Sequence, residues 1–267
     1  MQEYIQAICN RLKYEMKKQD RSGVYGFTQN EMCYNSNRIE GSMLSKDQTL
    51  SIFTTGTLTV DGTIRSKDIE ETTGHFAMFN YMLQTMEEPL TQEMIKTFHY
   101  KLKSGVWEDM ANGYAVGDYK KRDNTVGNIK MAKPTEVEER MKELLEWYNS
   151  QEKTLDILSE FHIRYERIHP FQDGNGRTGR ILLFRECLVN SIAPFVIQDE
   201  NKLEYYNALK EQSIELMSTF FKKEQIDYAK AVIGFVFTEE EMRCLACEEW
   251  LSDVIKEYCS SKSNCCE

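Results

Sequence analysis

The sequence predicts an all-α protein, a bundle of helices with a β-hairpin beside one loop. Apolar residues recur at helical spacing through most of the 267 residues, and only 4 Pro and 14 Gly interrupt them. Several segments also open with the pattern of a capping box, a Ser or Thr followed three residues later by Glu or Gln. These pairs are Thr28 and Glu31, Ser45 and Gln48, and Thr238 and Glu241, and the pair of Asn201 and Glu204 resembles one.

Two stretches depart from helical spacing and predict hairpins. Residues 57–65 alternate around Asp61-Gly62, and residues 117–134 contain the run GDYKKRDNTVGN. The alternative for the second stretch is an ordinary surface hairpin without a role in function.

The charge balance excludes some classes of partner. The chain has 33 basic and 43 acidic residues, a net charge of -10, which repels phosphate backbones. It also has no run of about 18 apolar residues and no pattern of a secretory signal. We therefore expect a cytoplasmic protein that binds neither nucleic acid nor membranes.

Two consecutive helices frame the most informative loop. The first covers residues 154–168, and the residues that share its apolar face are Leu155, Leu158, Phe161, Tyr165 and Ile168. The second covers residues 177–192 and is apolar almost all round, which is typical of a buried central helix. Helices packed in this way would hold the intervening loop rigidly.

The loop and the start of the second helix read HPFQDGNGRTGR, residues 169–180. Gly174 and Gly176 let backbone N–H groups approach an oxyanion closely. The helix start adds unpaired amides and the positive end of the helix dipole. Together these features predict a phosphate-binding site.

The charged residues of this segment suit a metal-bound polyphosphate. Arg177 and Arg180 lie one turn apart and can face the same anion. Asp173 can hold Mg²⁺ or Mn²⁺ together with phosphate oxygens. His169 is then free to act as a base, because an unperturbed imidazole has a pKa of about 6.5. Taken singly, each residue has a structural explanation, but the combination favours the anion site.

The segment HPFQDGNGRTGR resembles the signature of the Fic (filamentation induced by cAMP) family, H-x-F-x-D/E-G-N-G-R-x-x-R, at every specified position. The likeness extends over roughly residues 30–215. It implies a Fic fold, a helical bundle with a β-hairpin flap beside the active-site loop. It further implies three regions: N-terminal helices in residues 1–90, a Fic core in residues 91–215, and C-terminal helices packed on the core in residues 216–267.

The resemblance implies a protein adenylyltransferase with ATP as substrate and Mg²⁺ or Mn²⁺ at Asp173. His169 would deprotonate a Ser, Thr or Tyr hydroxyl of a target protein, which then attacks the α-phosphate. The implied nucleotide contacts are Gly174, Asn175, Gly176, Arg177, Arg180, Tyr205 and Tyr206. The implied flap residues, which would align the target by strand pairing, are Asn124, Thr125, Val126 and Gly127. For the two tyrosines, core packing is the alternative.

A second motif lies upstream, in residues 36–41, SNRIEG. It resembles the family's inhibitory motif, S/T-x-x-x-E-G/N, and so assigns an inhibitory role to Ser36, Glu40 and Gly41. Glu40 would pair with Arg180 and withdraw that arginine from the γ-phosphate. The alternative is a solvent-facing helix without this contact.

Other activities on the same loop stay open at this point. They are removal of AMP, transfer of another nucleotide or phosphate-containing group, and a non-catalytic role as a nucleotide-sensing module. The identity of the target cannot be read from the chain, although the chain itself is one candidate. A homodimer is another open option.

Overall fold

The computed structural model describes residues 2–59, 62–126, 129–245, 252, 254–256 and 258. The predicted all-α fold is confirmed. The first helices are α1 (Gln2–Lys18), α2 (Val24–Ile39), α3 (Lys46–Thr55), α4 (Ser66–Gln84), α5 (Gln92–Lys103) and α6 (Trp107–Asn112). They are followed by α7 (Pro134–Ser150), α8 (Leu155–Ile168), α9 (Asn175–Val189), the short 3-10 helix η1 (Asp199–Asn201), α10 (Lys202–Glu211), α11 (Ile214–Val236) and α12 (Glu239–Leu245). Of the helices described, none has the length and apolar character needed to cross a membrane.

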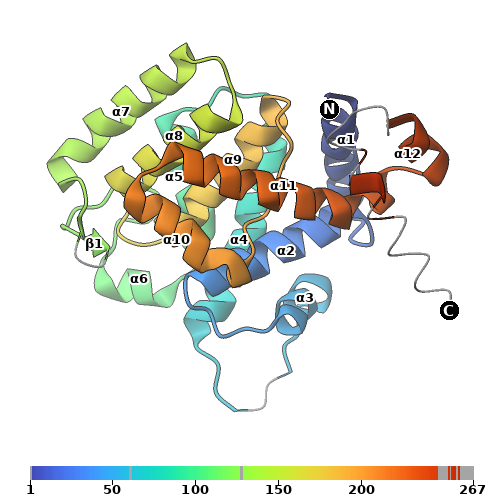
Figure 1. The fold of residues 1–267 in the computed structure, drawn as a ribbon. Helices are drawn as coiled ribbons and strands as arrows, with labels where there is room; N and C mark the ends of the chain where they lie inside the picture. The colour runs from blue at the N-terminus through green and yellow to red at the C-terminus, as the bar shows by residue number, and fades with distance from the viewer. Residues whose placement is uncertain are drawn as a thin grey trace.

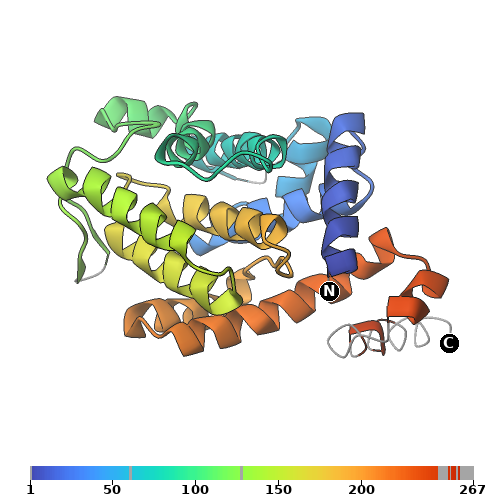
Figure 2. The ribbon, with the colours of Figure 1, turned by 90° about the horizontal axis from the view of Figure 1, so that it is seen from above.

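Helix α9 is the centre of the molecule (Figure 1). Helices α4 and α5 cover one side of it, and α8 and α11 lie on the opposite side (Figure 2). Every residue from Arg177 to Leu188 is buried, as expected from its apolar sequence. Helix α2 also packs against α9, so a segment from the N-terminal part of the chain reaches the predicted loop.

The apolar face predicted for α8 is also confirmed. Leu158, Phe161, Tyr165 and Ile168 are buried, and Leu155 is partly buried against the same core. The Phe161 ring lies 4.6 Å from the ring of Tyr148 in α7, between centroids. Helices α7 and α9 thus hold α8 on two sides.

The predicted capping boxes have different outcomes. Ser45 and Gln48 form the complete box at the start of α3, and Thr238 and Glu241 exchange the corresponding bonds. The box at Thr28 is wrong, because α2 begins at Val24 and Thr28 lies inside it. The Thr28 hydroxyl is instead 2.7 Å from the hydroxyl of Tyr228 in α11, so a tertiary contact has replaced the cap.

The two predicted hairpins also differ. Strands β1 (Thr125–Val126) and β2 (Ile129–Lys130) pair antiparallel, and the residues between them lie outside the described part of the chain. Residues 57–59 and 62–65 contain no strand, and residues 60–61 are outside the described residues. The backbone carbonyl groups of the expected first strand accept hydrogen bonds from α3 instead. The Ser51 hydroxyl donates to the Thr57 carbonyl, and the Gln48 side-chain amide donates to the Thr59 carbonyl.

Candidate active site

His169 ends α8 in the left-handed backbone conformation, with φ 51° and ψ 64°. Its N–H group donates to the Tyr165 carbonyl at 2.9 Å, which closes the last helical turn. A side chain with a Cβ atom rarely adopts this conformation, and such positions concentrate at functional sites. The turn sends the chain from α8 into the loop and leaves the His169 side chain 18% exposed.

The loop is anchored by Phe171, which is fully buried. Its ring stacks on the imidazole of His99 in α5, with 3.9 Å between centroids. The Gly117 N–H donates to His99 Nδ1 at 2.9 Å, so His99 Nε2 carries the proton and donates to the Asp173 carbonyl at 3.0 Å. Burial lowers the pKa of His99 to about 3, so this imidazole is neutral near pH 7.

The Asn175 side chain holds the loop together. Its Oδ1 accepts from the Phe171 N–H at 2.7 Å, and its Nδ2 donates to the Phe171 carbonyl at 2.8 Å. Only 2% of the residue is exposed. This placement favours a loop-holding role over the phosphate contact that the family resemblance implies.

The start of α9 has the features of an anion site. Gly174 precedes it with φ 82° and has no side chain to cap the first amides, while its own N–H donates to Asp173 Oδ1 at 2.7 Å. A Cβ atom on Gly176 would come within 2.3 Å of Glu40 Oε1 and 2.8 Å of Arg180 Nη1. The Glu40 carboxylate therefore lies against the first turn of α9, where a phosphate is expected.

Arg180 joins this helix start to α2. Its Nε donates to the Ser36 hydroxyl at 2.8 Å, and its Nη2 donates to the Ser36 carbonyl at 3.0 Å and to Glu40 Oε1 at 2.7 Å. Gly41 follows with φ 86°, a conformation that suits Gly at the end of a helix. The structure thus brings together Ser36, Glu40, Gly41 and Arg180, four of the residues singled out in the sequence.

Arg177 lies on the other side of the turn and is 2% exposed. It forms an ion pair with Glu71 of α4 and donates to Asn37 Oδ1 of α2 at 3.3 Å. Burial disfavours the charged guanidinium, but the Glu71 and Asp173 carboxylates outweigh burial and hold the pKa of Arg177 above its ordinary value. Neither partner was anticipated from the sequence.

Asp173 belongs to a group of buried charges, here called the Lys103 cluster (Glu71, Lys103, Asp109 and Asp173). The Lys103 ammonium is 1% exposed, forms an ion pair with Glu71, and lies 2.8 Å from Asp109 and 2.9 Å from Asp173. Lys67 of α4 approaches Asp173 from the open side at 3.2 Å. Burial raises the pKa of Asp173, but Arg177 and Lys103 outweigh it and hold that pKa well below its usual range.

Asp173 is the residue of this group that could contribute an oxygen ligand to a metal ion. Asp173 is ionised and its side chain is 33% exposed, so one carboxylate oxygen can reach a hard cation bound to phosphates. The described residues contain no group of three His, Cys, Asp or Glu side chains that could hold a metal ion unaided.

A cavity of about 470 Å³ opens beside His169, a size typical of small-molecule sites. Its lining includes Glu40, Gly176, Arg180, Tyr205 and Tyr206 from three separate parts of the chain. Tyr205 is 1% exposed, whereas Tyr206 is 42% exposed. The two tyrosines therefore differ: one lies mainly in the core and the other faces the cavity.

The polar contacts of the two tyrosines fit this difference. The Tyr205 hydroxyl is 2.7 Å from Nε2 of His162 in α8. The Tyr206 hydroxyl donates to the Ile39 carbonyl at the end of α2, at 3.0 Å. Tyr206 thus fastens the end of α2 over the cavity.

The predicted flap is tied to the loop by its first residues. Asn124 Nδ2 donates to the Phe171 carbonyl at 3.0 Å, and Lys120 Nζ donates to Asn124 Oδ1 at 2.6 Å. Thr125 and Val126 form β1, whereas Gly127 lies outside the described residues. The described part of this segment is therefore adjacent to the loop, and its role toward a target stays a prediction.

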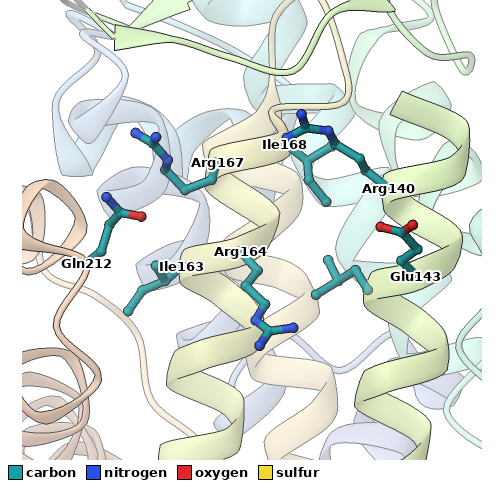
Figure 3. Close-up of a pocket in the computed structure, with 8 residues that line it drawn as sticks. Arg140, Glu143, Ile163, Arg164, Arg167, Ile168 and Gln212 are labelled. Atoms are coloured by element: carbon teal, nitrogen blue, oxygen red, sulfur yellow. The ribbon is translucent and has the colours of Figure 1, made fainter. Parts of the chain in front are cut away.

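A second hollow of about 330 Å³ lies on the outer side of α8 (Figure 3). Arg140 and Glu143 reach it from α7, whereas Arg167 lies on the side of Gln212. Arg140 is paired with Glu136 at 2.9 Å, and Arg164 is paired with Glu160, both within their own helices. Two of its three arginines are thus neutralised locally, and the hollow shows no concentrated positive charge.

Comparison with known proteins agrees with this geometry. Residues 89–187 match the model of the Fic/DOC family, and the match includes the loop and most of α9. The chain carries a Fic domain of this family. The Fic domain accounts for α5 to α8 and for α9 up to Cys187, whereas α2 and α10 lie outside the matched residues.

Relatives extend the Fic likeness beyond the matched domain. Protein adenylyltransferase fic-1 of Caenorhabditis elegans is 27% identical over 184 residues, covering 66% of this chain and 35% of the relative. A probable protein adenylyltransferase of Aquifex aeolicus is 31% identical over 133 residues, 46% of this chain and 41% of the relative. The chain thus spans less than half the length of either protein.

A solved structure shares the fold over most of the chain. It is a Fic domain containing signaling protein from Bacteroides thetaiotaomicron, with a TM-score of 0.70 and 24% sequence identity. The match covers 89% of this chain and 99% of that protein. The Fic fold therefore includes helices on both sides of the family-model match.

Sequence reasoning missed Glu71, His99, Lys103 and Glu166, which all lie near the loop. One feature of the sequence could have indicated such residues: a titratable side chain on a helix face that is otherwise apolar. In α5, for example, His99 and Lys103 are buried together with Phe98 and Leu102. Such a residue needs a buried partner, but the sequence does not show which element supplies it.

We expect Lys103→Met to destabilise the fold by about 3–5 kcal/mol, because it leaves several buried carboxylates without their ammonium partner. Urea denaturation of the purified chain measures the change. Lys222→Met, at an exposed position in α11, is the matched control and should change stability by about 0.5 kcal/mol or less. Equal stability of the two variants would contradict the role given to Lys103.

Proposed function

We propose that this chain is a protein adenylyltransferase that moves AMP from ATP onto a Ser, Thr or Tyr hydroxyl of a target protein and is inhibited by Glu40. One observation carries the proposal: the Glu40 carboxylate lies against Gly176 and pairs with Arg180 at 2.7 Å. An anionic side chain of the protein thus occupies a site suited to a phosphate. The names of the two relatives support the same reaction.

In the proposed reaction, His169 is the general base. The target O–H bond breaks, its proton passes to the imidazole, and the oxygen attacks the α-phosphorus. The bond from that phosphorus to the leaving pyrophosphate breaks, and its electron pair leaves with pyrophosphate. General-base catalysis of this kind typically contributes about 10²–10⁴-fold. Mg²⁺ or Mn²⁺ held by Asp173 would neutralise phosphate charge when bound.

Binding of the substrates is assigned to different parts of the site. The amides at Gly174 and Gly176 and the guanidinium groups of Arg177 and Arg180 bind the phosphates in this proposal. Tyr206 and the cavity wall hold the nucleoside. Strand β1 pairs with an extended segment of the target, and the chain itself is one candidate target.

The inhibitory contact acts through Arg180. While Glu40 and Ser36 hold this guanidinium, it cannot bind the γ-phosphate, so ATP would bind without the alignment needed for transfer. The Tyr206 bond to the Ile39 carbonyl helps to keep α2 in this position. Glu40 and His169 also line the same cavity, which keeps removal of AMP as a second candidate function.

We expect Glu40→Gly to raise incorporation of AMP into protein at least several-fold, because Arg180 loses its competing carboxylate. Intact-protein mass spectrometry after incubation with ATP and Mg²⁺ measures the adduct. Glu87→Gly is the control, since Glu87 is 92% exposed and contacts only the surface residue Lys13 among the described ion pairs. Unchanged labelling in the Glu40 variant would refute the inhibitory role, and faster loss of AMP from modified wild-type protein would favour removal.

We expect His169→Ala to abolish AMP transfer while ATP still binds, because the base does not hold the phosphates. Isothermal titration calorimetry measures binding, and labelling with ATP carrying a marked α-phosphate measures transfer. Both measurements use the chain that also carries Glu40→Gly, in which Arg180 is free of its competing carboxylate. In that chain Arg180→Ala provides the contrast, since it should weaken ATP binding itself. Loss of binding in the His169 variant would show that the imidazole is structural.

A further inference from the structure

Glu166 lies one helical turn before His169 in α8, and its side chain is 12% exposed. Its Oε2 atom is 3.7 Å from Nδ1 of His169. Both residues line the cavity that also contains Arg180. The carboxylate therefore faces the imidazole from the side opposite to Nε2, the second nitrogen of the ring.

The Glu166 carboxylate is charged despite its burial. Burial raises its pKa, but the neighbouring His169 and His162 and the Arg180 guanidinium outweigh burial and hold this pKa below its ordinary value. Its other oxygen, Oε1, has no hydrogen-bond partner in the described part of the chain. Nδ1 of His169 is likewise a buried atom without such a partner among the described residues.

A buried polar atom without a partner is costly, and here Nδ1 of His169 lies 3.7 Å from the Glu166 carboxylate. A carboxylate in a cavity suited to a triphosphate would also repel the substrate unless a neighbouring group offsets its negative charge. A small rotation of the ring would convert the 3.7 Å approach into a hydrogen bond, and such bonds are often long before substrate binds. The geometry favours a functional pair over a packing contact.

The neighbouring helix leaves room for this carboxylate at a glycine. A Cβ atom on Gly179 of α9 would come within 2.8 Å of Glu166 Oε1 and 3.0 Å of His162 Cε1. Gly179 occupies one of the unspecified positions of the HPFQDGNGRTGR segment. A larger residue there would push Glu166 out of line with the imidazole.

We propose that Glu166 is a positioning residue for His169. It accepts a hydrogen bond from Nδ1–H, fixes that tautomer, and leaves the lone pair of Nε2 to take the proton of the target hydroxyl. The carboxylate then stabilises the imidazolium that forms, while the hydroxyl oxygen bonds to the α-phosphorus and pyrophosphate leaves with its electron pair. This inference rests on the proposed transferase function.

Other groups that face Glu166 do not duplicate this role. His162, from the same helix, is neutral because burial lowers its pKa to about 4, and its Nε2 is engaged with the Tyr205 hydroxyl of α10. Arg180 of α9 is held by Ser36 and Glu40. Among these groups, His169 is the one that the reaction requires to gain a proton.

The test compares Glu166→Gln with Glu160→Gln, a change of the same kind earlier in α8. Both are made in the chain that also carries Glu40→Gly. We expect Glu166→Gln to lower kcat for AMP transfer about 10–100-fold and to leave the KM for ATP unchanged. The loss should not exceed the contribution of the general base itself, which is typically about 10²–10⁴-fold. Glu160→Gln should leave both constants unchanged. Glu166→Asp, which withdraws the carboxylate by one carbon, should give an intermediate kcat.

A second measurement does not depend on catalysis. Nitrogen chemical shifts of ¹⁵N-labelled histidine report the tautomer of neutral His169 in the same chain without substrate. We expect mainly the Nδ1–H tautomer with Glu166 present and loss of this preference in Glu166→Gln. An unchanged tautomer and kcat, or equal losses in Glu160→Gln, would overturn the inference. If even the Glu40→Gly chain transfers no AMP, the proposed function fails, while the tautomer still decides the pairing.

Discussion

The contact on which the site depends is the one between the Glu40 carboxylate and the first turn of α9. A helix start with two glycines and two arginines is a strong anion site, and in this chain an anion of the protein is already there. The contact joins α2, which lies outside the family-model match, to the centre of the Fic domain. Ser36 of the same helix contacts Arg180 through both its hydroxyl and its carbonyl, so α2 is tied to this turn by more than the carboxylate.

The two arginines at the loop have carboxylate partners that differ in burial. Arg177 pairs with Glu71, whose side chain is 7% exposed, whereas Arg180 pairs with Glu40, whose side chain is 32% exposed. Removing a carboxylate from a buried arginine is costly unless another anion replaces it. A nucleotide phosphate can replace the exposed Glu40 more easily than the buried Glu71. In the proposed function, Arg180 is therefore the arginine that exchanges its carboxylate for a phosphate, whereas Arg177 keeps Glu71 when it binds the phosphates.

The sequence was sufficient for the parts of the molecule that follow local rules. The apolar periodicity predicted α8 and α9, and the two sequence motifs predicted that Glu40 pairs with Arg180. The sequence did not predict the contacts between segments that are far apart in the chain. Thr28 has the local pattern of a cap but lies inside α2 against Tyr228, and Asn175 uses its amide on the loop backbone.

The charged partners of the loop were missed for a related reason. Glu71 and Lys103 come from α4 and α5, and no spacing rule places them beside Asp173. Glu166 is only three residues from His169, but a charged residue on a helix usually faces solvent. Its burial follows from the approach of Gly179 in the next helix, which only the packing of α8 on α9 reveals.

A crystal structure of the chain soaked with ATP and Mg²⁺ tests the central claim most directly. The account predicts phosphate oxygens within about 3 Å of the backbone amides at the start of α9, with Arg177 beside them and the Glu40 carboxylate displaced or competing for Arg180. A structure with ATP bound elsewhere, or with this turn empty and both arginines directed away from it, would contradict the account.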